Sequence, residues 1–490
     1  MSRRRDALFA LILAAAVPAA SADNFAPPTD VPGGSAVSRT GISPESDGNA
    51  PLLVTTSFLK GASLRLYGFV ETDSIYDTTQ SLTEEPDNNL IQRRTVAPGA
   101  GGASSVNNIA GQRGREEMSV RNSRLGGEIT IPTTDSGWKT KGIFEIDFLG
   151  NQGVTTAPGA TPGAQSENNF FNNPALRVRH AYVDLTKGEL NYKIGQTWSL
   201  FGWQPYYFPG ETTILPSPGM LYRRFAQARV TDTHRIADGW NLETAADAAK
   251  PAEMNSGSPE WQGGVRIAST KITGASINGA YTSMVGLSAA LSGVLVPTRT
   301  TNIGNPTGQG AAFDFFIPII PSSNGKSRDN TLVLGGEAGA GTGIGGLEYA
   351  GLSLGVPGLS ASAPGADGAI DPGIGGVNSA GDFQLLQVRA FRAHLQYSLK
   401  QWATSFGYSQ VEARNLNVFS SLLSNNAAQN LALVNGLAPK IQYGYVSVMY
   451  DPLDWLRFSA EVSQTRDTYN DANNRYAANN RYQLSAFFKF

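Results

Sequence analysis

Apolar and polar residues alternate by twos along many segments of this 490-residue chain. The last segment, Arg481–Phe490, has apolar side chains at its even-numbered positions and mostly polar side chains at its odd-numbered ones. Successive side chains of a β-strand point to opposite faces, so this strand would be apolar on one face only. In a soluble protein such a strand would leave an exposed pairing edge, whereas in a closed membrane barrel it pairs with the first strand. The pattern predicts an all-β fold, a transmembrane antiparallel β-barrel.

The number of strands follows from segments long enough for a tilted membrane crossing, about 9–11 residues. Fourteen segments qualify: Ser63–Thr78, Met118–Pro132, Gly137–Leu149, Ala175–Thr186, Leu190–Leu200, Leu221–His234, Trp240–Lys250, Trp261–Thr270, Ala275–Val285, Gln384–Leu399, Trp402–Arg414, Lys440–Asp451, Asp454–Thr468 and Asn479–Phe490. The region 286–383 is irregular and rich in Gly and Pro, but Leu287–Val296 and Leu347–Val356 would form one more pair. An even number is required if both ends lie in the periplasm. We predict sixteen strands, with fourteen as the alternative.

Connections between these segments are either very short or long. The short ones are Thr133–Ser136, Lys187–Gly188, Ala237–Gly239, Lys400–Gln401 and Asp451–Leu453, and the long ones are Thr79–Glu117, Asn151–Asn173, Phe201–Met220 and Asn415–Pro439. Outer-membrane barrels have tight periplasmic turns and larger external loops. We therefore expect the short connections at the periplasmic end and the long loops outside the cell.

Alternation also decides which charged residues face the barrel interior. The following residues are turned inward: Arg124, Glu128, Glu145, Asp147, Lys193, Arg223, Arg229, Arg266, Arg392 and His394. A charged interior holds water, so we expect an open barrel. Trp198, Trp240 and Trp402 lie near strand ends, where the girdles at the membrane interfaces place aromatic side chains.

The N-terminal region reads as an export signal. Residues Arg3 to Arg5 are basic, Leu8 to Ala20 form an apolar run too short for a membrane-spanning helix, and Ala20-Ser21-Ala22 is a cleavage site with small residues. The segment 1–22 is thus predicted to be a signal peptide. Residues 23–60, rich in Pro, Gly, Ser and Thr, would be a flexible periplasmic extension, and 61–490 the barrel.

Composition narrows the classes of protein. The formal net charge of −2 lacks the basic excess expected of a nucleic-acid-binding protein. The chain has no cysteine, which excludes disulfides and thiolate chemistry. Its three histidines, His180, His234 and His394, include no closely spaced pair that would suggest a metal site. We therefore predict no cofactor, no metal and no enzymatic activity.

Several stretches of the chain resemble the DcaP-like trimeric porins of proteobacterial outer membranes. They are Leu66–Tyr76, Arg121–Gly126, Arg179–Leu185 and Ile194–Trp198, and the resemblance covers roughly Leu64 to Thr231. It implies a sixteen-stranded homotrimer whose pore favours small anionic solutes such as dicarboxylates. In this chain, the resemblance implies that Arg124, Arg179, Arg223 and Arg229 line the pore. The alternation of the strands predicts that Arg392 and His394 line it as well. Relatives with an N-terminal helical segment differ from this chain, because 23–60 has no heptad pattern.

The connection Phe201–Met220 is too apolar for a solvated loop. We expect it to fold into the lumen as a constriction loop carrying Trp203, Tyr206, Tyr207 and Glu211, with packing against a neighbouring subunit as the alternative. Inward arginines opposite this loop would make the pore positive and favour anions. Alternatively, Arg223 and Arg229 pair with the carboxylates of Glu128, Glu145 and Asp147.

Together these features predict a porin of the bacterial outer membrane that passes small hydrophilic solutes by passive, selective diffusion and prefers anions. Its partners would be small anionic solutes, outer-membrane lipid and two further copies of itself. The alternatives are a non-selective general diffusion porin, or, from a different class, an outer-membrane barrel enzyme or an adhesive barrel.

Overall fold

The computed structural model describes residues 52–55, 61–82, 90–96, 106–150, 175–212, 217–251, 256–297, 306–345, 352, 374–377, 382–419, 435–473 and 475–490. The predicted signal peptide lies outside the described residues. Within the predicted flexible extension, 23–60, only β1 (Leu52–Thr55) is described. Among the described residues, no helix is both long and apolar enough to cross a membrane.

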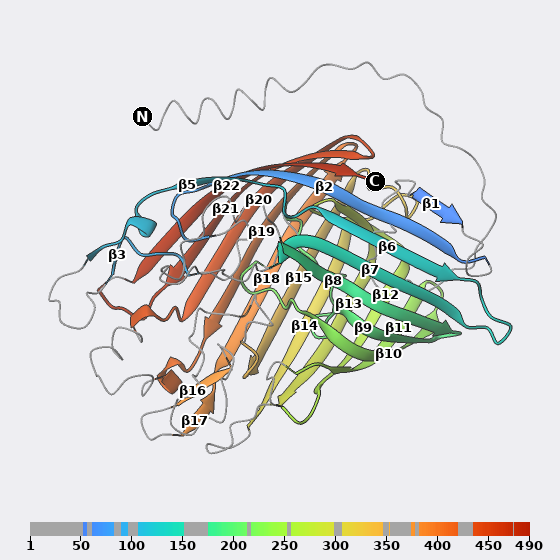
Figure 1. Ribbon diagram of the computed structural model, residues 1–490, viewed down its shortest axis with the longest axis horizontal. Helices are drawn as coiled ribbons and strands as arrows, with labels where there is room; N and C mark the ends of the chain where they lie inside the picture. Colours follow the sequence, from blue (N-terminus) through green and yellow to red (C-terminus); the bar gives the residue numbers. More distant parts are fainter. Residues whose placement is uncertain are drawn as a thin grey trace. The chain divides into compact units, whose positions relative to one another are not determined.

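The chain forms one antiparallel barrel of sixteen crossings (Figure 1). The crossings are β2 (Ser63–Asp77), β5 with β6 (Arg115–Ser119 and Arg124–Ile131), β7 (Lys139–Gly150), β8 (Ala175–Lys187), β9 (Leu190–Trp198), β10 (Arg224–Ala237), β11 (Trp240–Ala249), β12 (Glu260–Asn278), β13 (Tyr281–Pro297), β14 (Thr307–Ile320), β15 (Thr331–Thr342), β18 (Gln387–Leu399), β19 (Trp402–Ala413), β20 (Lys440–Leu453), β21 (Leu456–Thr468) and β22 (Tyr476–Lys489). β5 and β6 are two halves of one crossing because both pair with β2. Two short pairs, β3 (Thr95–Val96) with β4 (Val106–Asn107) and β16 (Gly375–Val377) with β17 (Phe383–Leu385), lie in connections.

Pairing of the first strand with the last closes the barrel. β2 pairs with β22 from Phe69 opposite Lys489 to Asp77 opposite Arg481. Gly68 and Phe490 exchange two backbone hydrogen bonds of 3.0 Å, and β1 continues along the same edge of β2 beyond them. The terminal strand therefore leaves no free edge over this stretch, as the alternation predicted.

Connection lengths separate mostly by end, as expected. Two residues join β8 to β9, β10 to β11, β18 to β19 and β20 to β21 at one end of the barrel (Figure 1), and two residues also join β12 to β13, whose turn is described below. The connection between β14 and β15 is an exception at this end, with the ten residues 321–330. At the other end the shortest connection is that between β21 and β22, residues 469–475, and the longest join β2 to β5 and β15 to β18. One turn is shifted, because Asp451–Leu453 still belongs to β20 and the chain reverses at Asp454–Trp455.

Side-chain exposure follows the predicted parity. In β21, Phe458 and Val462 are 46% and 51% exposed, whereas Arg457 and Asp467 are fully buried. The exterior is apolar and the interior is polar, which is the arrangement that a lipid-embedded barrel requires.

The prediction for residues 261–383 was partly wrong. Trp261–Thr270 and the first part of Ala275–Val285 belong to the single strand β12, and the expected turn between them is a register shift between Ala268 and Thr273. Leu287–Val296 lies within β13, while Leu347–Val356 is outside the described residues except for Leu352.

The strands β14 and β15 complete the sixteen and were not predicted, because their Gly, Ala and Pro content suggested loops. Small residues are accommodated here because the inner face of this wall is covered by another part of the chain, described below.

Candidate functional site

The connection between β9 and β10 folds into the barrel, as predicted for the constriction loop. We call its described residues, 199–212 and 217–223, the constriction loop. Phe201, Tyr207 and Leu221 are fully buried within it, and Trp203 and Glu211 are at most 4% exposed. The loop therefore fills part of the interior instead of packing on a neighbouring subunit.

The beginning of the loop is bound to the wall formed by β12 and β13. The backbone N–H groups of Leu200 and Phe201 both donate to Oε1 of Gln262, at 2.8 and 2.9 Å, and that of Gly202 donates to Ser292 Oγ at 3.0 Å. Backbone donors that would otherwise be buried and unsatisfied are thus paired with wall side chains.

Two glycines, Gly264 on β12 and Gly310 on β14, allow the close approach. A Cβ at Gly264 would lie 2.7 Å from the Trp203 ring nitrogen, and a Cβ at Gly310 would lie 3.2 Å from the Phe201 ring. Glycine in these strands is therefore a packing requirement of the loop.

Glu337 on β15 holds the two arms of the loop together. Its carboxylate accepts hydrogen bonds from Gln204 Nε2 (2.9 Å), the Leu221 N–H (2.7 Å) and Arg392 Nε (3.1 Å). Because this carboxylate is 1% exposed, each of these bonds is made away from bulk water.

Tyr206 and Tyr207 continue the attachment toward the middle of the loop. The Tyr207 hydroxyl donates to Ser288 Oγ at 3.2 Å and accepts from Arg266 Nε at 3.2 Å, while its carbonyl accepts from Arg392. The Arg266 guanidinium also lies 3.8 Å from the centre of the Tyr206 ring.

The far end of the loop reaches β20 and β21. Thr212 donates its N–H to Glu461 Oε2 at 2.8 Å, and Ser447 Oγ donates to the Gly210 carbonyl at 2.7 Å. The constriction loop therefore spans the interior from the β12–β15 wall to β20 and β21.

Three of the arginines predicted to line the pore are engaged in ion pairs with the wall. Arg223 pairs with Glu260, Arg229 with Asp247 at 3.2 Å, and Arg392 with Glu337. The alternative prediction named Glu128, Glu145 and Asp147 as partners of Arg223 and Arg229; the partners are instead carboxylates on β11 and β12. His394 is buried, and neither ring nitrogen has a hydrogen-bond partner among the described residues.

A second group of arginines lies on the other side of the interior, on β6, β8 and β10. We call Arg124, Arg177, Arg179 and Arg224 the arginine face. Arg179 donates to Glu145 at 2.7 Å and to Asp147 at 2.9 Å, and Arg177 donates to Asp147 at 2.7 Å. A register shift in β8 turns Arg179 and its neighbour His180 to the same buried side, which a regular strand would not do.

Arg124 and Arg224 pack on aromatic rings and pair with no carboxylate among the described residues. The Arg124 guanidinium lies 5.4 Å from the Phe69 ring and 5.5 Å from the Tyr281 ring, and it donates to the Tyr281 hydroxyl at 3.4 Å. Arg224 lies 5.0 Å from the Trp198 ring and donates to the Tyr222 hydroxyl at 3.1 Å. Within the described part of the chain, Nε and one terminal nitrogen of each have no hydrogen-bond partner.

Sequence reasoning missed Arg177 and Arg224. Arg177 shares the parity of Arg179, so the alternation of β8 could have identified it. Arg224 has the parity of lipid-facing positions, and only its pairing in register with the buried Trp198 brings it inside. Trp198 itself was expected at a membrane interface; it packs instead against Phe208 of the constriction loop and Tyr222.

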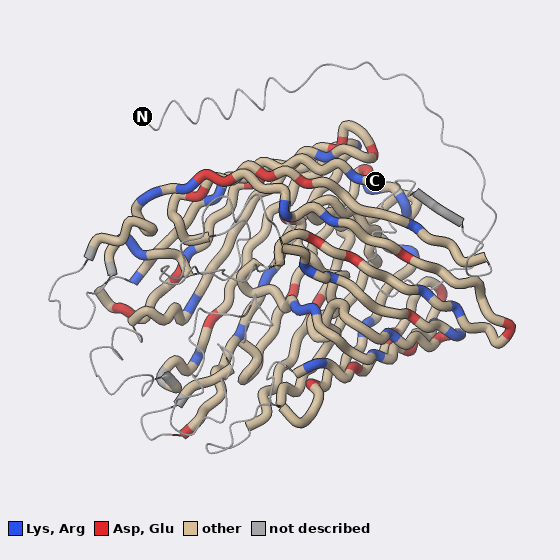
Figure 2. The backbone as a smooth tube through the Cα atoms, viewed as in Figure 1, with Lys and Arg blue, Asp and Glu red and all other residues tan. Residues whose placement is uncertain are grey.

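Charge is distributed unevenly around the barrel. Figure 2 shows charged residues along β2 and β6 to β10 and few along β13 to β15. β13 has none, and β14 and β15 have one each, Asp314 and Glu337.

Candidate sites for other chemistry lie away from this interior. Among the described residues, one group could offer three metal ligands: the exposed Glu189 and His234 and the half-buried Asp232. The two imidazole nitrogens are each 2.8 Å from one of the carboxylates, so both are already occupied. The pattern Gly351-Leu-Ser-Leu-Gly355 matches that of a nucleophile elbow, but apart from Leu352 it lies outside the described residues.

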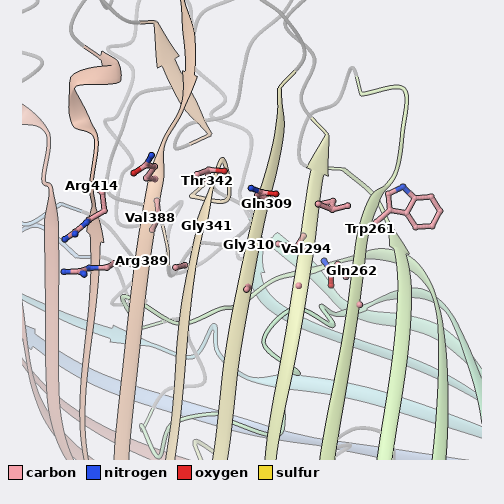
Figure 3. Close-up of a pocket in the computed structure, with 16 residues that line it drawn as sticks. Trp261, Gln262, Val294, Gln309, Gly310, Gly341, Thr342, Val388, Arg389 and Arg414 are labelled. Atoms are coloured by element: carbon pink, nitrogen blue, oxygen red, sulfur yellow. The ribbon is translucent and has the colours of Figure 1, made fainter.

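A groove of about 960 Å³ near the long-loop end lies on the outer face of the barrel (Figure 3). Its floor is a row of small residues that pair across β12 to β15: Gly263, Gly293, Ala311 and Ala340. They share the parity of the exposed Trp261 and Leu295, so the groove is outside the candidate solute path.

Comparison with known proteins supports the fold. Neither a protein-family model nor a curated protein matches the sequence. Among solved structures, the chain is similar to the outer membrane channel DcaP of Acinetobacter baumannii, with a TM-score of 0.56 and 16% identity over 89% of this chain and 99% of that one. Weaker likenesses are Salmonella typhi OmpF (TM-score 0.46, 12% identity, 90% of this chain and 100% of that one) and Pseudomonas putida OprB (TM-score 0.46, 8% identity, 86% and 94%). The predicted resemblance to DcaP-like porins is confirmed at the level of the fold, that of an outer-membrane channel.

Proposed function

We propose that this barrel is a porin of the bacterial outer membrane that passes small hydrophilic solutes by passive diffusion and prefers anions such as dicarboxylates. The closed sixteen-strand barrel, its apolar exterior and its charged interior support a channel. The resemblance to DcaP-like porins supports the solute class and a homotrimeric assembly. No cofactor and no covalent step are needed for this activity.

The arginine face is the observation that carries the anion preference. Arg124 and Arg224 carry buried guanidinium donors that have no hydrogen-bond partner, and neither forms an ion pair with a carboxylate among the described residues. A guanidinium can bind a carboxylate through two parallel hydrogen bonds, and in a confined path its field concentrates anions. These two residues are therefore better candidates for selectivity than Arg223, Arg229 and Arg392, whose charges are paired.

The constriction loop supplies the other half of the mechanism. Its aromatic residues Trp203, Tyr206 and Tyr207 and the buried Glu211 occupy interior volume that a solute would otherwise use. A solute would enter between the long loops, pass the space between the constriction loop and the arginine face, and leave at the short-turn end.

A non-selective general diffusion porin is the second candidate. It is favoured by the extensive pairing of interior charge, because a neutralised ion pair attracts neither anions nor cations strongly. The two candidates differ only in the effect of the arginine face.

Planar-bilayer recording in a KCl gradient tests both. We expect an open channel whose reversal potential is biased toward anions, and a reduced bias in the variant Arg124→Gln with Arg224→Gln. Arg124→Lys with Arg224→Lys keeps both charges and is the matched control, expected to retain the bias. A cation bias would eliminate the anion preference, an unbiased channel would favour the general porin, and no conductance would favour an adhesive barrel or a barrel enzyme.

A further inference from the structure

The hairpin between β12 and β13 leaves the barrel wall and enters the interior. From Thr273 to Ala280 every residue is buried, and Ala275 and Ile277 are fully buried. A strand in the wall exposes alternate residues to lipid, so burial of consecutive residues means that both faces of the hairpin are enclosed. We call residues Thr273 to Gly286 the inner hairpin; it begins at the register shift after Ala268.

The tip of the inner hairpin contacts distant strands of the barrel. Ile277 packs against Ala403 on β19 and Met449 on β20, and Ala280 packs against Phe69 on β2 and Phe487 on β22. β14, β15 and β18 separate β13 from β19 in the wall, so these contacts are made through the interior.

Polar contacts fix the hairpin in this position. Gln396 on β18 accepts from the Ile277 N–H at 2.8 Å and donates to the Ile277 carbonyl at 2.9 Å. Arg457 on β21 donates to the Gly279 carbonyl at 2.6 Å and to Thr282 Oγ1 at 2.8 Å. Arg457 is itself held by two hydrogen bonds to Asp451, of 2.6 and 2.8 Å. The hairpin is therefore anchored on two strands besides its own.

The inner hairpin also touches the constriction loop. Asn278 Nδ2 donates to the Pro209 carbonyl at 2.6 Å, and the Gly279 N–H donates to the Glu211 carbonyl at 2.9 Å. On another side, Tyr281 faces Arg124 of the arginine face. Tyr281, a residue of the hairpin, therefore contacts the arginine face, along which we expect solutes to pass.

The chemistry of the hairpin differs from that of the arginine face. Gly274 to Val285 contains no charged residue. A neutral obstruction limits the size of a solute without selecting the sign of its charge. We propose that the inner hairpin is a second constriction of the same channel, at the short-turn end, which sets the size limit for solutes independently of their charge. This inference rests on the proposed function.

Two variants test the proposal. In the first, Gly274–Val285 is replaced by the dipeptide Asn-Gly, which supports a tight hairpin turn. In the second, Tyr281→Ala removes only the ring that faces Arg124, so that the test does not depend on folding of the shortened barrel. Tyr281→Phe keeps the ring and is the matched control for its size.

Liposome swelling with uncharged sugars of increasing size gives the size limit, and bilayer recording gives conductance and reversal potential. We expect the deletion to raise conductance several-fold and to admit larger sugars, and Tyr281→Ala to do so to a smaller degree, while Tyr281→Phe keeps the wild-type size limit. The preferred sign of charge should stay the same in the deletion variant.

The outcomes separate this inference from the proposed function. If the wild type conducts and neither the deletion nor Tyr281→Ala changes the size limit, the inference is wrong and the porin stands. If the deletion conducts and the wild type does not, the hairpin closes the channel instead of setting a size limit, and both the inference and the proposed passive diffusion are wrong. If neither conducts, the proposed function and the inference fail together.

Discussion

Two sides of the barrel interior are built on different principles. On β6 to β10, long charged side chains project from the wall, and two of the arginines pair with no described carboxylate. On β13 to β15, the wall has only two charged residues and is rich in Gly, Ala and Ser, and a loop covers it. Small neutral residues let backbone approach backbone, whereas charged residues need space and water or partners. One side is thus suited to attract a solute and the other to narrow the passage.

The largest effect is expected from breaking the attachment of the loop. Glu337→Ala leaves the donors of Gln204, Leu221 and Arg392 without their common acceptor, which should cost about 3–5 kcal/mol of folding free energy, as for a broken buried ion pair. Urea unfolding of the reconstituted barrel would measure this loss, and channel recording should show a larger or noisier conductance. Asp314→Asn, at the position paired with Glu337 across the sheet, removes a like-charged neighbour and should not destabilise the barrel. Equal losses in both variants would contradict this role of Glu337.

Substitution of an ion-paired arginine should mainly lower the stability of the barrel, whereas substitution of an arginine without an ion pair should mainly change its ion selectivity. Arg223→Gln leaves the buried Glu260 without its cation and should destabilise the barrel by about 3 kcal/mol. This value is near the lower bound for a broken buried ion pair, because Gln262 still donates a hydrogen bond to Glu260. Arg124→Gln breaks no ion pair and should mainly shift the reversal potential. Unfolding and bilayer measurements on both variants test the contrast, which is lost if Arg223→Gln alters selectivity more than Arg124→Gln.

Gly264→Ala tests the packing of the constriction loop against the barrel wall. Its new Cβ would lie 2.7 Å from the Trp203 indole nitrogen and force the loop to shift, at a cost of about 1–3 kcal/mol, as for overpacking of a core. Gly263→Ala is the matched control on the opposite face of the same strand, where the nearest atom is 3.9 Å away. Thermal or urea unfolding should therefore distinguish these adjacent substitutions, and similar stability of the two would argue against close packing of Trp203.

The smallest effect on the channel is expected for Tyr207→Phe. It removes a hydroxyl that bonds Ser288 and Arg266 but keeps the ring in place, so the loss should be about 1–3 kcal/mol, because each of the two hydrogen bonds contributes about 0.5–1.5 kcal/mol. The conductance should stay close to that of the wild type. A loss as large as that of Glu337→Ala would mean that the ring, and with it the loop, has moved.

Prediction from the sequence succeeded where the alternation was regular. β21 and β22 have the expected bounds within a few residues and the expected inward and outward sets, because lipid on one side and a polar interior on the other impose a period of two. It also placed the constriction loop inside, since so many apolar residues in one connection need burial. The roles of the predicted site residues, the signal peptide and the trimer stay predictions.

Prediction from the sequence failed where the side chains of a strand do not alternate between lipid and a polar interior. β14 and β15 were missed because their inner faces meet another segment, so glycine and alanine replace the usual alternation. Arg224 was missed because it has the parity of Ala226 and Ala228, and its contacts with Trp198 and Tyr222 depend on the tertiary structure. The partners of Arg223 and Arg229 were misassigned because the nearest carboxylate depends on which residues stand opposite each other across the sheet.

The chain's amino-acid order by itself determined that strands would form and, where the alternation was regular, which of their faces would meet lipid. These are local properties, set by side-chain period and segment length. Only the tertiary structure decided what fills the cylinder: which arginines keep free donors, how the constriction loop is held, and that the inner hairpin turns inward. Each of these depends on contacts between residues far apart in the chain, which no local pattern encodes.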